Sequence, residues 1–186
     1  MTDPIGLTPH IERFFGTRAK PGVWDAEFLR RKGLEITTLH VPPTPAFDFD
    51  TYISAGLSRL SQPGAGLHDY ILASPFATEE HCELITMMAH MMRSTGRAWH
   101  LGEVIHMGRP WIHGGTPDRL LVSLPYPFGP ALEEADTVTP GLRLLWLLPI
   151  HAAEEQVLHS HGLEALEERF DTVGIDFLDP VRPCVV

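Results

Sequence analysis

The chain has 186 residues, 44% of them hydrophobic, and a formal net charge of −10. This length suits one hydrophobic core, so we expect a single domain over residues 1–186. The excess of 24 acidic over 14 basic side chains opposes nucleic-acid binding, and no apolar run reaches the ~18–20 residues that a membrane span needs. The start of the chain lacks a signal-peptide pattern, which predicts a cytoplasmic protein, and its 2 cysteines do not form a disulfide framework.

Residues 1–33 predict a helical lead-in to the domain. Thr8 is the expected cap of its first helix, Pro9 occupies the first helical position, and Gly16 ends the helix. We therefore place the main sheet after this segment.

The next segments predict strands separated by a stiff loop. Residues 34–41 alternate apolar and polar side chains, as half-buried strands do. Three prolines within residues 42–45 then break the strand and favour an extended loop. Further strands are expected at residues 52–55 and 67–73, joined by a glycine-containing turn.

The clearest helical pattern follows, with a cap at Thr78 and a stop at Gly96. Apolar side chains recur within it at helical spacing: Leu84, Ile85, Met88, Met91 and Met92. A methionine-rich stripe can form an adaptable binding groove, but this spacing favours a place in the core.

The second half of the chain predicts a long loop, a buried strand and a closing helix. Residues 99–117 are rich in Gly, His, Pro and Trp, and are mainly loop. The apolar residues 144–148 indicate a strand that is buried on both faces and ends at Pro149. Residues 163–173 indicate a final helix. Together these elements predict an α+β fold, with a mixed, mostly antiparallel central sheet covered by helices.

No familiar catalytic motif is present in the sequence. It has no G-x-S-x-G, no P-loop and no dinucleotide-binding glycine pattern. Its histidines include His151, His159 and His161, but the H-E-x-x-H spacing of zinc hydrolases is missing. We expect no metal and no cofactor. The alternative hypothesis is a small hydrolase or metal-dependent enzyme that uses the histidines and an acid–base pair at Asp48 and Asp50.

Three stretches resemble the suppressor of fused domain family. The first is Tyr-Ile-Ser-Ala-Gly-Leu-Ser, which opens residues 52–60; the others are residues 99–105 and 145–170. The resemblance runs over residues 41–186. It implies a non-enzymatic protein-binding domain. Animal relatives sequester Gli-type transcription factors by gripping a peptide between two domains, whereas bacterial single-domain relatives are associated with toxin systems as immunity proteins.

The resemblance therefore predicts a protein partner, such as a toxin domain with a basic surface. It also places Tyr52 at the position of a tyrosine that lies at the peptide groove of the animal proteins. Aromatic anchors ringed by acidic groups suit a basic target, and a proline-stiffened loop loses little entropy on binding. We predict a partner-binding patch of Phe47, Asp48, Phe49, Asp50 and Tyr52, extended by Trp111 and Asp118 of the second loop. The alternative is that Phe47 and Phe49 pack into the core and the aspartates are solvated.

Overall fold

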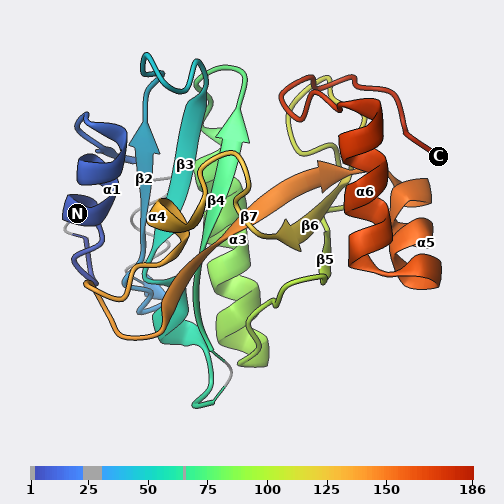
Figure 1. The fold of residues 1–186 in the computed structure, drawn as a ribbon. Helices are drawn as coiled ribbons and strands as arrows, with labels where there is room; N and C mark the ends of the chain where they lie inside the picture. Colours follow the sequence, from blue (N-terminus) through green and yellow to red (C-terminus); the bar gives the residue numbers. More distant parts are fainter. Residues whose placement is uncertain (1–2, 23–30, 65) are drawn as a thin grey trace. The chain divides into compact units, whose positions relative to one another are not determined.

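The computed structural model describes residues 3–22, 31–64 and 66–186, and its strands form a seven-stranded sheet in the order β1-β2-β3-β4-β7-β6-β5 (Figure 1). The strands are β1 (Lys20–Gly22), β2 (Thr37–Val41), β3 (Asp50–Ala55), β4 (Leu67–Ser74), β5 (Val104–His106), β6 (Arg119–Ser123) and β7 (Leu142–Ile150). The helices are α1 (Thr8–Phe15), α3 (Glu80–Thr95), α4 (Pro130–Glu133), α5 (Ala152–His161) and α6 (Leu163–Val173), with a 3₁₀ turn η1 (Leu57–Leu60). The predicted α+β class, with a mixed and mostly antiparallel sheet, is confirmed.

The chain forms two compact units. Unit 1 contains residues 1–98 and 124–146, and unit 2 contains residues 99–123 and 147–186. Strand β7 passes from the first unit into the second, so one continuous strand belongs to both. The single domain expected over residues 1–186 stays a prediction.

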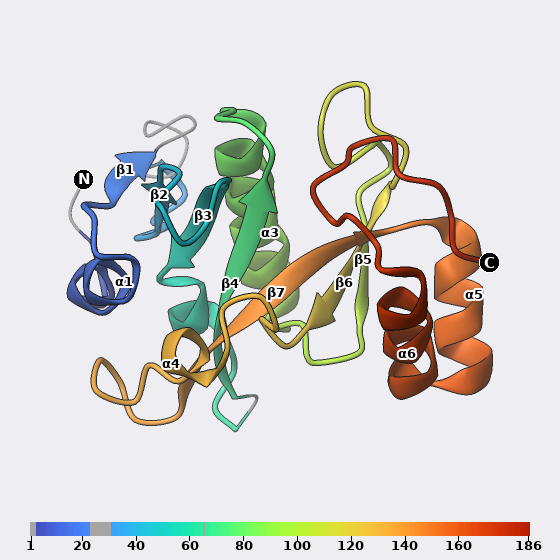
Figure 2. The ribbon, with the colours of Figure 1, turned by 45° about the horizontal axis from the view of Figure 1, so that its top comes forward.

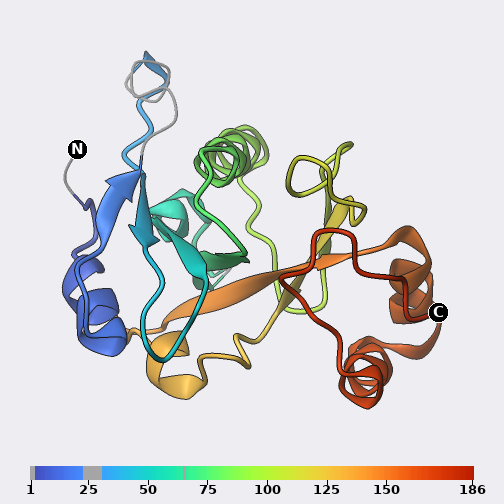
Figure 3. The same cartoon turned by 90° about the horizontal axis from the view of Figure 1, so that it is seen from above.

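In unit 1, strands β1 to β4 pair antiparallel with their neighbours, and β4 pairs parallel with β7. Helix α3 lies on one face of these strands, and α1 and α4 lie on the other (Figure 3). Met88 and Met92 of α3 are fully buried, as predicted for the methionine stripe, whereas Met91 is only half-buried. Gly96 ends α3 in the left-handed conformation, with φ +66°, as the sequence indicates.

The apolar run in β7 is buried on both faces, as predicted. Trp146 is 5% exposed and Leu147 is fully buried, although their side chains point to opposite faces of the strand. The predicted end at Pro149 is wrong by one residue, because β7 continues through it to Ile150. None of the helices in the described ranges is long and apolar enough to cross a bilayer.

Unit 2 contains an antiparallel pair of short strands and two helices that pack side by side (Figures 1 and 2). Leu166 and Phe170 of α6 are buried, as the helical pattern predicts. Val173 continues the same apolar spacing along the helix, but it is 60% exposed. The buried face of α6 therefore ends one turn earlier than its apolar pattern does.

Two predictions for the start of the chain are wrong. Thr8 does not cap α1; instead Asp3 accepts hydrogen bonds from the Thr8 backbone N–H at 2.5 Å and from its hydroxyl at 2.7 Å. The lead-in is also not wholly helical, since residues 20–22 form β1 against β2. Residues 23–30 of the predicted lead-in lie outside the described residues.

Candidate functional site

The Tyr-Ile-Ser-Ala-Gly-Leu-Ser motif surrounds a buried carboxylate, that of Asp69 on β4. The hydroxyls of Ser54 and Ser58 donate to it at 2.6 and 2.7 Å, and the backbone N–H of Leu57 donates at 2.9 Å. Asp69 has no exposed surface. Burial raises its pKa to about 6, although the hydrogen bonds from both serines act to lower it. These motif residues therefore join β3, η1 and β4 through one acceptor.

Gly56 of the same motif is required by the backbone. Its φ is +110°, and a Cβ there would lie 2.7 Å from the carbonyl oxygen of Glu35 and 2.8 Å from Cγ of Pro4. Only glycine fits both the conformation and the space. The serines and the glycine of this motif thus hold the fold, and they offer no exposed chemical group.

Tyr52, the predicted groove residue, is enclosed by two histidines. Its ring stacks on that of His40 with centroids 4.7 Å apart and meets His81 edge-on at 5.0 Å. The Tyr52 hydroxyl accepts a hydrogen bond from the backbone N–H of Thr78 at 2.7 Å. Burial raises the pKa of this phenol, which is 3% exposed. Tyr52 thereby links β3 to the start of α3.

Two polar pairs beside Tyr52 resemble catalytic pairs in distance. Nε2 of His81 lies 3.0 Å from Oγ of Ser74, and Nε2 of His40 lies 2.5 Å from Oδ1 of Asp50. A nucleophile must reach its substrate, yet Ser74 and His81 are both fully buried. The Ser74 hydroxyl also donates to the carbonyl oxygen of Phe76 at 2.7 Å. The first pair is therefore placed to hold the end of β4 against α3.

Two of the predicted loop residues, Phe47 and Phe49, lie in an aromatic cluster. Its rings have centroids 5.0 to 6.4 Å from their neighbours and come from Phe14, Phe15, Phe47, Phe49 and Phe128. The cluster joins α1, the loop at residues 42–49 and the segment that precedes α4. This contact fixes the loop on unit 1.

The exposure of the side chains differs from residue to residue along this loop. Phe49 is 7% exposed and Asp50 is 5% exposed, whereas Phe47 is half-buried and Asp48 is exposed. Pro43, Pro45 and Ala46 are also exposed. Tyr126, two residues before Phe128 of the cluster, is 59% exposed. We call the set of Pro43, Pro45, Phe47, Asp48 and Tyr126 the loop surface.

The other two predicted residues, Trp111 and Asp118, belong to unit 2. Trp111 is 2% exposed, and its backbone N–H donates to the carbonyl oxygen of Pro117 at 3.0 Å. Asp118 is half-buried and forms an ion pair with Arg119. The structure therefore brings Phe47, Phe49 and their neighbours together in unit 1, and it does not assign Trp111 and Asp118 to the same surface.

The candidate metal ligands have separate partners. Nε2 of His151 lies 3.0 Å from the carbonyl oxygen of Arg182, and Nδ1 of His161 lies 2.8 Å from Oγ of Ser160. His159 lies 3.9 Å from Glu155. In the part of the chain that the structure describes, no group of three or more His, Cys, Asp or Glu side chains is arranged to hold a metal ion.

Glu154 and Glu155, the acidic residues at the start of α5, are buried rather than solvated. Glu154 is fully buried and receives two parallel hydrogen bonds from Arg182, at 2.7 and 2.6 Å. Burial alone would raise its pKa, but the hydrogen bonds from Arg182 and from the backbone of His151 and Val185, together with the charge of Arg182, hold the pKa below its ordinary value. Glu155 is held in the same way by His106 and Arg119, each 2.6 Å away. Sequence spacing gave no signal for these pairs, because Arg182 lies 28 residues from Glu154.

The fold and the site define a class of protein. It is an α+β scaffold in which the motif residues hold strands and turns together, while a proline-stiffened loop carries the exposed groups near the predicted site. Residues 32–183 match the family model of the Suppressor of fused protein (SUFU), and the chain belongs to this family.

Solved structures agree with this assignment. A SUFU homolog from Neisseria gonorrhoeae FA 1090 is 31% identical, with a TM-score of 0.83 over 96% of this chain and 93% of that one. A structure of the Sufu–Fu complex shares the fold at 12% identity, with a TM-score of 0.69 over 99% of this chain and 93% of that one. Drosophila Suppressor of Fused, at 14% identity and a TM-score of 0.60, is matched over 81% of this chain and 42% of its own. No curated protein matches the chain significantly.

Proposed function

We propose that this chain is a non-catalytic protein-binding domain of the suppressor of fused family, acting in the cytoplasm as one domain over residues 1–186. The observation that carries the proposal is membership of the family over residues 32–183. One solved relative of the same fold is a complex of Sufu with Fu. The buried placement of Ser74 and His81 is consistent with a structural role for the groups that look most like a catalytic pair.

The loop surface is our proposed contact site on unit 1. Asp48 and the half-buried Phe47 would touch the partner, while the buried Phe49, Asp50 and Tyr52 would support them. The aromatic cluster already orders this loop, so little conformational entropy remains to be lost on binding. Trp111 and Asp118 stay a separate prediction, since they belong to unit 2.

The partner we propose is a toxin domain with a basic surface, which this chain would neutralise as an immunity protein. The net charge of −10 would attract such a surface at long range. The exposed Asp48 would meet a basic group within the contact. A gene beside that of the present chain is the natural source of such a partner.

The experiment compares variants of the loop surface in a binding assay against the product of the neighbouring gene. Asp48→Lys and Tyr126→Ala change exposed side chains, so both variants should remain folded. We expect each to weaken binding by about tenfold or more, which is ~1.4 kcal/mol. Glu35→Lys is the matched control, because Glu35 is exposed on unit 1 and precedes the opposite end of β2. Equal binding by all three variants would remove the loop surface from the interface.

A further inference from the structure

An open groove runs along α6 in unit 2. It has a volume of about 460 Å³ and is lined by Ala165, Glu168, Arg169, Thr172, Val173 and Val185. The spacing of the helical residues places them on one face of α6. The other wall is Val185.

The groove presents apolar side chains that the core leaves exposed. Helix α6 packs Leu166 and Phe170 inward, while Val173 is 60% exposed. Val173 lines the groove together with Val185 and Ala165. Apolar side chains that are exposed in a concavity are typical of an interaction site.

The wall formed by Val185 is fixed in place. The backbone N–H of Val185 donates to Oε1 of Glu154 at 3.2 Å, and that carboxylate is held by Arg182. Arg182 also donates to the carbonyl oxygen of Pro149 at 2.9 Å, and its guanidinium lies over the ring of Phe170. The groove is therefore formed before any partner binds, which lowers the entropy that binding costs.

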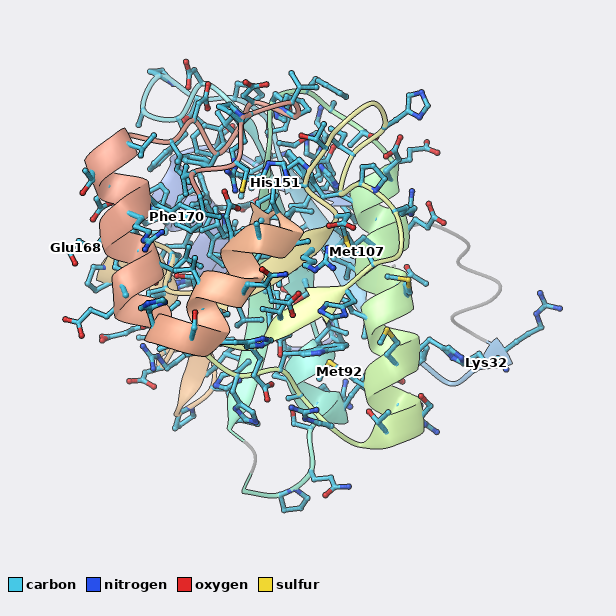
Figure 4. The ribbon with its side chains drawn as sticks, turned by 90° about the vertical axis from the view of Figure 1, so that its right-hand side faces the viewer. Lys32, Met92, Met107, His151, Glu168 and Phe170 are labelled. Carbon is cyan, nitrogen blue, oxygen red and sulfur yellow. The ribbon has the colours of Figure 1, made fainter. Side chains whose placement is uncertain are left out.

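The surroundings of the groove are acidic. Glu164, Glu168, Asp171 and Asp176 are exposed on α6 and just beyond it, against one exposed cation, Arg169. Arg182, the other cation after residue 162, is buried in its pair with Glu154. Glu168 points outward from α6 in Figure 4. Within the lining, Glu168 and Arg169 carry opposite charges. The excess negative charge comes from the exposed Glu164 and Asp171, each next in sequence to a lining residue, and from Asp176.

We infer that this groove binds a basic segment of a partner protein, one whose apolar side chains reach Val173 and Val185 while its lysines or arginines meet Glu168 and Asp171. The inference rests on the proposed function and adds a second contact surface to it. A second copy of this chain would bring like charges together, and nucleic acid or an anionic membrane would be repelled. The apolar lining and the acidic rim thus favour the same occupant.

The test uses a fluorescent amphipathic peptide of leucine and lysine as the probe, and the same peptide with glutamate in place of lysine as its control. Fluorescence anisotropy measures binding of each peptide to the full chain. The Glu168→Lys/Asp171→Lys variant changes the rim, and Val173→Ser changes the apolar lining. The matched control, Glu35→Lys/Glu134→Lys, makes the same change in net charge with exposed residues of unit 1 that lie outside the loop surface. Thermal melts confirm that all variants are folded.

We expect the lysine peptide to bind and the glutamate peptide not to bind. The rim variant should weaken binding at least tenfold and Val173→Ser about threefold or more, while the control variant should weaken it far less. Equal weakening by the rim and control variants would mean attraction to net charge alone and would overturn the inference. So would concentration-dependent dimers in sedimentation that Val173→Ser abolishes, because they would make a second copy the occupant.

The failure of this inference can be told apart from that of the proposed function. If the neighbouring gene product binds the wild-type chain and the α6 rim variant equally well, the function stands and the groove is not part of that interface. If that product binds neither protein, the proposed partner is wrong, and the peptide measurement alone decides whether the groove binds basic segments.

Discussion

Asp69 shows how a single residue can give a motif its role. Ser54, Leu57 and Ser58 are separated from it by more than ten positions, yet all three donate to its carboxylate. Removing the acceptor would leave several buried donors without a partner, and each would then carry a desolvation penalty. The motif is therefore better explained by this acceptor than by contact with a ligand.

The raised pKa of Asp69 makes part of the stability depend on pH. Because the folded state binds this proton more tightly, its contribution to the free energy of unfolding is fully present below about pH 4 and is lost as the pH rises through about 6. The full change is roughly 3 kcal/mol. Urea unfolding from pH 4 to pH 7 should therefore show wild type losing stability relative to Asp69→Asn. If the difference in unfolding free energy between the two proteins stays constant over this pH range, the raised pKa of Asp69 is contradicted.

Arg182 is the second residue with a large expected effect. Replacing it with Met leaves the fully buried Glu154 charge without its partner, which should cost about 3–5 kcal/mol. The double variant Arg182→Met/Glu154→Leu removes both charges and should recover most of the loss. Chemical denaturation measures both values. A cost below about 1 kcal/mol for the single variant would show that the pair is not buried in solution.

At the scale of elements, strand β7 is the centre of the fold. Trp146→Ala should cost about 3–5 kcal/mol, because a large side chain is lost from a strand that is buried on both faces. Val173→Ala, on the exposed side of α6, is the control and should change stability by less than about 0.5 kcal/mol. Similar small effects for both would mean that β7 is not central.

The loop at residues 42–49 gives a further prediction. Phe47→Ala removes a half-buried ring that contacts Phe14 and Phe128, so it should lower stability by about 1–3 kcal/mol. The same variant should weaken partner binding by loosening the loop. Asp48→Ala should leave the free energy of unfolding unchanged, because that side chain is exposed. Thermal unfolding of the two variants distinguishes the side chain that stabilises the loop from the side chain that is available to contact a partner.

The elements that the sequence predicted well have strong local signals. Helix α3 has both a stop glycine and a regular apolar stripe, and β7 has an unbroken apolar run. The errors arise where a distant residue decides the outcome. The Asp3 carboxylate, and not the Thr8 side chain, accepts a backbone N–H at the start of α1, and Arg182 pairs with Glu154 inside the protein. The candidate loop was located, but which of its side chains face solvent depends on the aromatic cluster, which no local pattern reveals.

For the whole molecule, the distribution of charge bears on the proposed partner. The chain carries a net charge of −10, and its exposed loop and the groove of α6 both have acidic side chains at their edges. Attraction between such surfaces and a basic protein raises the association rate and is screened by salt. A protein partner bound in this way should therefore be held less tightly as the ionic strength increases.

The most direct measurement is a calorimetric titration of the purified chain with the product of the neighbouring gene, made at about 50 mM and 500 mM salt. The proposal predicts a defined complex whose affinity falls by at least tenfold at the higher salt concentration. A complex of unchanged affinity would contradict the acidic interface. The lack of any complex, with both proteins shown to be folded, would contradict the proposed binding function for this partner.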